Sequence, residues 1–415
     1  MTFEFSLRNG EVMIELKNRV GLFALAMMPL LATSAWAQSG YVVTELGTLG
    51  GTESAALGLN DANQVVGWSN AANGQKHAFR WSQGSMLDLG TLGGDASVAW
   101  AINNAGVVVG ESLPTGQTGS ANYRAFIFQN QTMTPLATLG GTWSVAYDLN
   151  ESGVIAGLSY NTFQREQAVT WTGGAITNIA AAGGATDQRT RGYGLNDAGA
   201  VTGWGYTPLA GPNNAFRYSG GQWTQIGGFG QFQNSEAYDI GNSGIVVGSS
   251  APPTGGDWHA AIWLPANPTV AVILGTLPGF SLAELDDING DDHAVGRAYV
   301  DNVQSRAIYF DGKALSDLND FLPDSFQGDL VDAREINENG AIAATARHKG
   351  VLRAVLLTPA TPGDIDLNGV VDVNDLLAVI SSWGPCPPSG SCPADLNGDT
   401  QVDVNDLLIV ITHWS

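Results

Sequence analysis

One phrase occurs seven times along the chain, and this periodicity limits the possible folds more than any other feature. In most copies the phrase is Leu or Ile, then Asn, two residues, Gly and small aliphatic residues, and a second phrase resembling HAFRW follows. Ala78 and Ala354 hold the same place in the first and last copies, so 276 residues over six intervals give a period of 46. Such a period is typical of repeat proteins, whose units stack on one another. The copies begin at Leu59, Ile102, Leu149, Leu195, Ile240, Ile288 and Ile336.

Each unit contains four short apolar runs separated by turn residues. In the second unit they are residues 86–92, 97–103, 106–110 and 124–128, and their Val, Ile, Phe and Trp content indicates strands rather than helices. The second and third runs are joined by turns such as Asn-Asn-Ala-Gly. Asparagine can bond its own downstream backbone and glycine accepts positive φ, so we expect a hairpin in every unit.

Four strands in 46 residues match the size of a β-propeller blade, which predicts a seven-bladed β-propeller over residues 38–360. A closed ring leaves no end blade bare, whereas an open β-solenoid or paired sandwiches are the alternatives. The strand-like runs start at Tyr41 and end near Thr358, at the same phase of the repeat. Either each sequence unit is one whole blade, or Tyr41–Leu46 completes the final blade.

The N-terminal segment indicates export. Two basic residues precede the apolar stretch 20–32, and Ala35-Trp36-Ala37 provides small residues where a signal peptidase cleaves. We therefore expect residues 1–37 to be a signal peptide and the protein to be extracellular or at the cell surface. Acidic residues near the N-terminus leave Met1 and Met13 as alternative starts. No other apolar run is long enough for a membrane span, so no membrane insertion is expected.

The chain is strongly acidic, with a formal net charge of −22. Phosphates would be repelled, so nucleic acid and anionic membranes are not expected partners. Beyond Arg353 there is no Lys or Arg, while eight aspartates follow. The acidity is therefore concentrated in the C-terminal tail.

These aspartates fall into two twelve-residue frames, each followed by an apolar helix-like run from Leu376 or Leu407. Oxygen ligands on alternate residues suit Ca²⁺, which takes six to eight of them. Residues 361–415 are therefore predicted to be a small all-α, EF-hand-like module that holds two calcium ions. The predicted ligands, with Val370 and Gln401 acting through backbone carbonyls, are Asp364, Asp366, Asn368, Val370, Asp372, Asp375, Asp395, Asn397, Asp399, Gln401, Asp403 and Asp406.

The duplicated pattern D-x-[DN]-x-[ND]-x-x-V-D-x-N-D with its helix resembles the type I dockerin module, including aspartate at position twelve. This resemblance implies calcium binding and a cohesin-type protein partner. Thr400 stands where position six is usually glycine, which predicts a weaker second site. The positions that carry partner recognition in dockerins are Val373-Asn374 and Val404-Asn405. The two copies match, as in dockerins with two interchangeable binding faces.

Two further features concern export. The only cysteines, Cys386 and Cys392, lie between the two loops and are expected to form a disulfide in an exported protein. The motifs GTLGG, S-x-A-x-x-IN, VVG and HAFRW over residues 41–358 resemble the extracellular HAF-repeat family. That resemblance implies export and a repeat fold, and it implies no known chemistry.

The repeats contain no G-x-S-x-G, no H-E-x-x-H and no cysteine nucleophile. An aromatic register two residues before the Leu/Ile-Asn phrase and Trp residues after the VVG-type run offer stacking surface, although packing between blades would also explain the register. Asp287, Asn289 and Asp291 form a partial calcium motif, or an ordinary charged turn. The candidate ligand-binding residues are Trp68, Trp204, Trp100, Tyr147, Tyr193 and Tyr238.

The main hypothesis is a secreted, non-enzymatic binding or scaffold protein with a monomeric propeller and a calcium-dependent docking module. Its partners would be a protein or a neutral glycan. The alternative is a polysaccharide-active enzyme, a lyase or glycoside hydrolase, with a dockerin-like tail, because scattered carboxylates could meet at the channel. A structural cell-surface or matrix protein is the third hypothesis.

Overall fold

The chain divides into two units, Met1–Trp36 and Ala37–Ser415. In the first unit, β1 (Phe3–Arg8) and β2 (Glu11–Leu16) pair antiparallel. The apolar stretch and the cleavage position of the expected signal peptide lie outside the described residues. The computed structural model describes residues 3–8, 11–16, 40–117, 122–184, 188–207, 211–228, 234–251, 256–300, 304–387 and 392–415.

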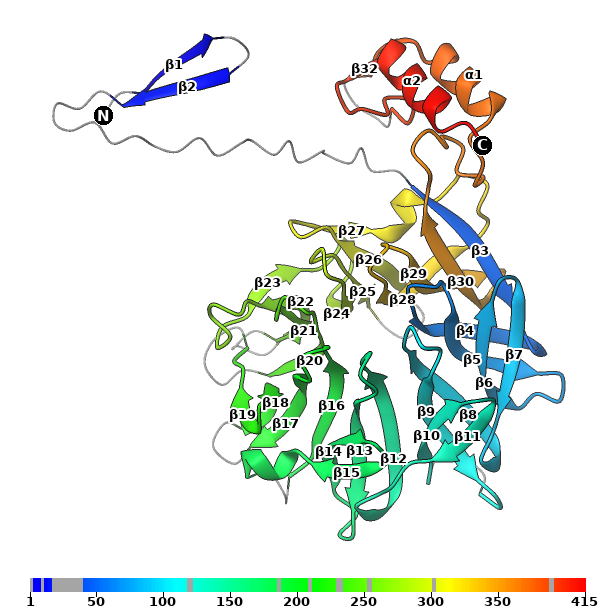
Figure 1. The fold of residues 1–415 in the computed structure, drawn as a ribbon, viewed down its shortest axis with the longest axis vertical. Coiled ribbons are helices and arrows are strands. Elements are labelled where there is room, and N and C mark those ends of the chain that lie inside the picture. Colours follow the sequence, from blue (N-terminus) through cyan, green and yellow to red (C-terminus); the bar gives the residue numbers. More distant parts are fainter. Residues whose placement is uncertain are drawn as a thin grey trace. The chain divides into compact units, whose positions relative to one another are not determined.

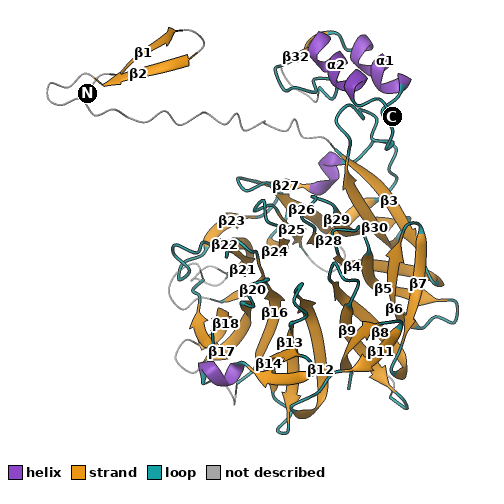
Figure 2. Ribbon diagram, viewed as in Figure 1, coloured by secondary structure: helices purple, strands orange, loops and turns teal. Residues whose placement is uncertain are grey.

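The second unit is mostly β, built from four-stranded antiparallel sheets that follow the sequence repeat (Figures 1 and 2). Consecutive strands pair within each sheet, as the hairpin turns predict, and a single bridge between Lys76 and Ala96 joins the first two sheets. The first four sheets contain β4 (Gly50–Leu59), β5 (Val65–Ala71), β6 (Lys76–Ser82) and β7 (Ser85–Gly90); β8 (Gly93–Ile102), β9 (Val108–Pro114), β10 (Arg124–Gln129) and β11 (Thr132–Pro135); β12 (Gly140–Leu149), β13 (Ile155–Asn161), β14 (Glu166–Thr172) and β15 (Ala175–Asn178); and β16 (Thr190–Leu195), β17 (Val201–Thr207), β18 (Gly211–Ser219) and β19 (Gln222–Gln225). The next two contain β20 (Ser235–Ile240), β21 (Val246–Ser250), β22 (His259–Trp263) and β23 (Val272–Gly275); and β24 (Leu282–Ile288), β25 (Ala294–Tyr299), β26 (Ser305–Phe310) and β27 (Leu315–Asp317). Short 3-10 turns are η1 (Ala180–Gly183) and η2 (Leu318–Phe321).

The remaining sheet joins the two ends of the repeat region. It contains β28 (Asp329–Ile336), β29 (Ile342–His348) and β30 (Val351–Pro359), and its outer strand is β3 (Tyr41–Gly47), which pairs antiparallel with β30. Of the two arrangements that the sequence left open, the structure has the one in which β3 completes the final sheet.

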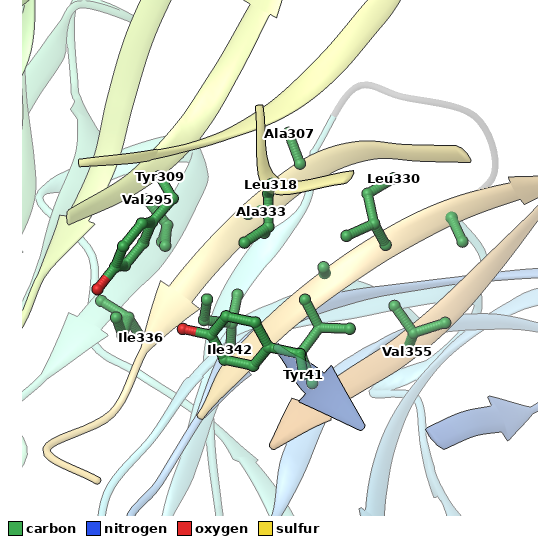
Figure 3. Packing of buried hydrophobic residues seen from close by; sticks show 13 residues of the cluster. Tyr41, Val295, Ala307, Tyr309, Leu318, Leu330, Ala333, Ile336, Ile342 and Val355 are labelled. Carbon is green, nitrogen blue, oxygen red and sulfur yellow. The ribbon is translucent and has the colours of Figure 1, made fainter. Parts of the chain in front are cut away.

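Tyr41 shows why this strand belongs there. Its side chain is buried and packs in one apolar cluster with Ile336, Ile342 and Val355, which come from the other three strands of the sheet (Figure 3). Leu46, at the other end of β3, is also buried and packs in the cluster that contains Leu59 of β4. The strand therefore contributes to the core on both sides of the junction between the last unit and the first.

The innermost strand of every sheet carries a bulge just before the Leu/Ile-Asn phrase. The pairing register shifts between Ala56 and Gly58, between Ala99 and Ala101, and at the corresponding place in the other sheets. The inner strand approaches its neighbour closely here, because a Cβ on Gly67 would overlap the carbonyl oxygen of Ala55. The glycine of the VVG-type run thus leaves room for this close approach in the first unit, whereas Ala344 takes the same place in the last sheet.

The asparagine of the repeated phrase links neighbouring units. In the first unit, Asn60 Oδ1 accepts from the backbone N–H of Gln64 at 2.9 Å, which closes its own turn, and Asn60 Nδ2 donates to the carbonyl of Asn103 at 3.0 Å. The same inter-unit bond leaves Asn103, Asn150, Asn196, Asn289 and Asn337. The bond from Asn337 returns to the carbonyl of Asn60 at 3.0 Å. This asparagine series makes the first and last units neighbours.

A second series runs beside it, and both series are interrupted between the fifth and the sixth unit. The N–H of Asp61 donates to Asn104 Oδ1 at 2.9 Å, and later units repeat this bond until Glu338 donates to Asp61 Oδ1. Gly241 replaces the asparagine of the fifth unit and Gly290 replaces the acceptor of the sixth. Between β20–β23 and β24–β27, both bonds are therefore missing.

Gly241→Asn is expected to restore the missing asparagine bond and raise the free energy of unfolding by about 1 kcal/mol. There is room, because a Cβ at Gly241 would have Ile288 Cγ2 as its nearest neighbour at 3.4 Å. Urea unfolding followed by tryptophan fluorescence measures the change. Asn289→Gly, which removes an existing bond of the series, should shift stability in the opposite direction. An unchanged or lowered midpoint for Gly241→Asn would contradict the role given to the series.

The C-terminal tail contains α1 (Val373–Ser381), β31 (Gly384–Pro385), β32 (Gln401–Val402) and α2 (Val404–Thr412). Both helices start with an aspartate capping box, formed by Asp372 and Asp375 in α1. The predicted disulfide between Cys386 and Cys392 is confirmed. Among the described residues, no helix is both long and apolar enough to span a bilayer.

Candidate functional site

The aromatic register lines a central cavity of about 490 Å³. Trp100, Tyr147 and Tyr238 are bulge residues of their inner strands, and Tyr193 lies in the corresponding irregular stretch of β16. Their rings contact one another across neighbouring sheets, with centroid distances of 5.6 Å from Trp100 to Tyr147, 5.0 Å from Tyr147 to Tyr193 and 5.5 Å from Tyr193 to Tyr238. These residues thus pack between units and also line the cavity, so the two interpretations of the register are compatible.

The next position of the inner strand brings four carboxylates into the same cavity: Asp148, Asp239, Asp287 and Glu335, here called the axial carboxylates. Asp148 accepts from the N–H of Leu195 in the next sheet at 2.7 Å, and Asp287 accepts from the N–H of Ile336 at 2.6 Å. Burial raises the pKa of Asp148 to about 8, with the charge of Asp239 adding to the effect. Burial also raises the pKa values of Asp239, Asp287 and Glu335. Asp148 and Asp287 therefore link neighbouring sheets, and burial favours the protonated form of all four axial carboxylates.

The free energy of unfolding is expected to fall as pH rises from about 4 toward about 8. The folded-state pKa values lie above the unfolded values of about 4, so folding binds protons, and the stabilisation is lost as pH rises through the folded values. A hydrogen bond between the Asp287 and Asp239 side chains further raises the pKa of Asp287 and lowers the pKa of Asp239, so Asp287→Asn should imitate a protonated Asp287. Urea unfolding in excess calcium should show a difference of at least about 1 kcal/mol between about pH 5 and pH 8, reduced in the variant. A pH-independent midpoint for the unaltered protein would contradict this assignment.

A second cavity, of about 580 Å³, shares Leu57, Trp100, Arg297 and Arg334 with the lining of the first. We call it the aromatic cavity, and its lining residues in or beside the first three sheets include Trp68, Lys76, Trp100, Glu111, Tyr123 and Trp143. Trp68 and Glu111 both directly follow the glycine of a VVG-type run, in β5 and β9. Sequence reasoning missed Glu111, although comparing this register between units would have found it.

Glu111 is a half-buried acid that lines the aromatic cavity. Its Oε2 accepts from the indole N–H of Trp143 at 3.3 Å. Burial raises the pKa of Glu111 to about 7, and the hydrogen bond from Trp143 opposes part of that rise. Near neutral pH the carboxyl group can therefore both donate and accept hydrogen bonds, beside the rings of Trp68, Trp100, Tyr123 and Trp143.

Trp68 and Trp204, the two predicted ligand-binding residues that follow a VVG-type run, differ in exposure. Lys76 Nζ lies 3.9 Å from the centroid of the Trp68 ring, and the Trp68 side chain is half-buried at the aromatic cavity. Trp204 occupies the same register in β17 but is only 8% exposed, and its N–H donates to Tyr193 Oη at 3.2 Å. Trp68 therefore presents a ring to the cavity, whereas Trp204 packs inside the protein.

The opposite side of the aromatic cavity carries ion pairs. Arg297 pairs with Glu284 at 2.7 Å. Arg334 pairs with Asp286 at 2.9 Å and with Asp332 at 2.8 Å. These guanidinium groups are therefore compensated by carboxylates of the inner strands β24 and β28.

In the C-terminal tail, the first acidic loop brings its carboxylates together. One oxygen from each of Asp364, Asp366 and Asp375 lies within 4.8 Å of the others. Asp375 is fully buried and accepts backbone N–H groups from Ile365 and Asp372. In the second loop, Asp406 accepts in the same way from Leu396 and Asp403, and Asp395 accepts from the N–H of Thr400. Convergent carboxylate oxygens are the donor set that Ca²⁺ prefers, so the residues present fit that ion.

Backbone conformation distinguishes the two loops at position six. Gly369 has φ of +90° in the first loop, and Thr400 has φ of +71° in the second. The structure thus places a threonine in the left-handed region, as the sequence pattern implies.

The partial calcium motif of the repeat domain is divided between two roles. Asn289 accepts from the N–H of His293 in its own turn and donates to the carbonyl of Asn337, while Asp287 belongs to the axial carboxylates.

Each helix of the tail exposes an apolar stripe. On α1 it consists of Val373, Leu377 and Ile380, each about half exposed, and α2 repeats it with Val404, Leu408 and Ile411. Spacings of four and three residues place each set on one helix face. The partner-recognition positions of the dockerin pattern, Val373-Asn374 and Val404-Asn405, begin these stripes.

Residues 362–414 match the family model for the dockerin type I domain. In sequence comparison, no curated protein is significantly similar to the chain. Among solved structures, the chain is similar to the β-propeller domain of the Trilobed protease from Pyrococcus furiosus, with 10% identity, a TM-score of 0.41, and coverage of 63% of this chain and 83% of that one. It is also similar to a puromycin-hydrolyzing peptidase from Mycobacterium tuberculosis, with 11% identity, a TM-score of 0.42, and coverage of 82% of this chain and 54% of that one. The chain therefore spans about half of that protein. A third similar structure is a putative TolB from Agrobacterium tumefaciens, with 12% identity, a TM-score of 0.38, and coverage of 71% of this chain and 90% of that one. The chain thus carries a C-terminal module of the dockerin type I kind.

Proposed function

We propose that this is a secreted, non-enzymatic recognition protein, in which a closed seven-bladed β-propeller is attached to a partner protein by its calcium-ordered C-terminal module. Residues 1–37 would direct export, 38–360 would form the propeller and 361–415 the docking module. The hydrogen bond from Asn337 to the carbonyl of Asn60 supports closure of the ring, as does the pairing of β3 with β30.

The observation that carries this proposal is the pair of matched apolar stripes on the dockerin-like helices. Exposed Val, Leu and Ile at identical places on α1 and α2 have no packing role in the small core of the module, which uses Val379 and Val410 instead. Contiguous exposed apolar residues on a soluble protein mark a protein-binding surface. Because the two stripes match, either helix could lead in contacting one partner surface.

Calcium would order this surface. Two ions are proposed, one held by the carboxylates of residues 364–375 and one by those of residues 395–406. Each bound ion would neutralise charges that converge at the start of a helix, and it would thereby hold α1 or α2 in place.

The test measures binding of the full chain to a panel of type I cohesin domains by calorimetry, with calcium and with chelator. Calcium-dependent binding to at least one cohesin is expected. Val373→Asp or Val404→Asp alone should weaken it less than about tenfold, because the other stripe still serves. The double variant should abolish binding. Leu87→Asp, which alters an exposed leucine of β7, is the matched control. Binding that persists in the double variant would contradict docking through these stripes.

One observation favours the second candidate, a polysaccharide-active enzyme. Glu111 has a pKa raised by burial to about 7, and Asp332 lines the same cavity. Glycoside hydrolysis uses a protonated and an ionised carboxyl group. Release of new reducing ends from a polysaccharide, abolished by Glu111→Gln, would favour the enzyme over the binding protein.

A further inference from the structure

We propose that the aromatic cavity binds a neutral sugar ring, with the tryptophan faces as the stacking surface and the Glu111 carboxyl group as the hydrogen-bond partner of its hydroxyls. This inference rests on the proposed recognition role of the repeat domain and assigns the ligand class to that role. The residues involved come from three neighbouring sheets, so only the folded ring brings them together.

The composition of the wall favours a sugar over a purely apolar ligand. Trp68, Trp100, Trp143 and Tyr123 line one cavity together with the charged groups of Lys76 and Glu111. A pyranose has an apolar C–H face and a rim of hydroxyl groups, so it is matched by an aromatic wall with a few polar groups. The cavity volume of about 580 Å³ lies within the usual range for small-molecule sites.

Glu111 is positioned by the tryptophans themselves. The indole N–H of Trp143 donates to its Oε2, which sets the orientation of the carboxyl group. Carboxyl oxygens accept bonds from adjacent hydroxyls, and a carboxyl group that is protonated near neutral pH also donates one. Lys76, whose ammonium lies over Trp68, supplies a further donor on an exposed side chain.

The overall negative charge of the protein, and the existing ion pairs of two of the cations that line the cavity, favour a neutral sugar over an acidic one. The cations Arg297 and Arg334 across the cavity are already paired with carboxylates at 2.7–2.9 Å. An acidic sugar would have to displace these pairs and approach Asp332, in a protein with a formal net charge of −22. A neutral ring meets neither obstacle.

The test titrates the full chain, in excess calcium, with cellohexaose, xylohexaose, mannohexaose and hexagalacturonate. Calorimetry and tryptophan fluorescence report binding. At least one neutral hexasaccharide is expected to bind and to change the fluorescence. Trp68→Ala, Trp143→Ala and Glu111→Leu should each weaken that binding about tenfold or more, whereas Glu111→Gln, which keeps hydrogen-bonding capacity, should retain most of it.

Phe163→Ala is the matched control, because Phe163 is an aromatic residue that is 80% exposed outside the cavity. It should bind like the unaltered protein. Melting temperatures show whether a weakened variant is still folded, and Glu111→Leu, of similar volume, keeps the test decisive if a tryptophan variant unfolds. Binding of hexagalacturonate alone, of no probe, or equally by all folded variants would overturn the inference. Calcium-dependent cohesin binding, measured on the same preparation, would then show whether the docking role survives.

Discussion

Deleting residues 1–48 should prevent the repeat domain from forming a stable monomer, whereas deleting residues 1–37 should leave it folded. The longer deletion removes β3, the outer strand on β30, and takes Tyr41 and Leu46 out of two apolar clusters. Losing two large buried side chains and a whole strand should lower the free energy of unfolding by more than about 5 kcal/mol. The bare edge of β30 should also promote aggregation.

Size-exclusion chromatography and circular dichroism distinguish these outcomes. The shorter deletion is the matched control, because it removes the expected signal peptide and keeps the closing strand. A monomeric, cooperatively unfolding protein without residues 1–48 would show that β3 is dispensable and would contradict closure of the ring by this strand.

Removing calcium should unfold the C-terminal module and leave the repeat domain intact. Carboxylate oxygens of Asp364, Asp366 and Asp375 lie within 4.8 Å of one another, so their charges repel each other unless a cation neutralises them. The core that would oppose this repulsion is small, with Val371, Val379, Ala394, Val402 and Val410 as its buried members. Scanning calorimetry of the full chain should therefore lose one transition in chelator, while the transition of the repeat domain keeps its temperature. Two unchanged transitions would contradict the prediction.

Thr400 offers a graded version of the same experiment. A threonine at φ of +71° is strained by about 1–2 kcal/mol, and glycine at this place is not. Thr400→Gly should therefore raise the calcium affinity of the second loop by about tenfold. Gly369→Thr should weaken the first loop by a similar factor. Calorimetric titration of the full chain with calcium would resolve both changes. Unchanged calcium affinities in both variants, compared with the unaltered protein, would show that position six does not limit calcium binding.

The sequence alone determined the local features of the protein. Seven copies of one phrase predicted four short strands per unit and a turn after each inner strand, and the sheets follow this pattern. The acidic frames, the helices that follow them and the disulfide between Cys386 and Cys392 were readable because each depends on residues close together in the chain.

The tertiary structure alone decided how the ends meet and which side chains face the cavities. Tyr41–Gly47 could complete the first unit or the last, because the repeat has the same phase at both ends, and only packing against Ile336 and Val355 selects the last. Likewise, Glu111 and Trp143 are 32 residues apart and belong to different sheets. A bulge turns consecutive residues of the inner strands toward the cavity, contrary to the simple alternation of a strand. Such bulges arise from pairing between strands, so no single segment of the sequence could reveal them.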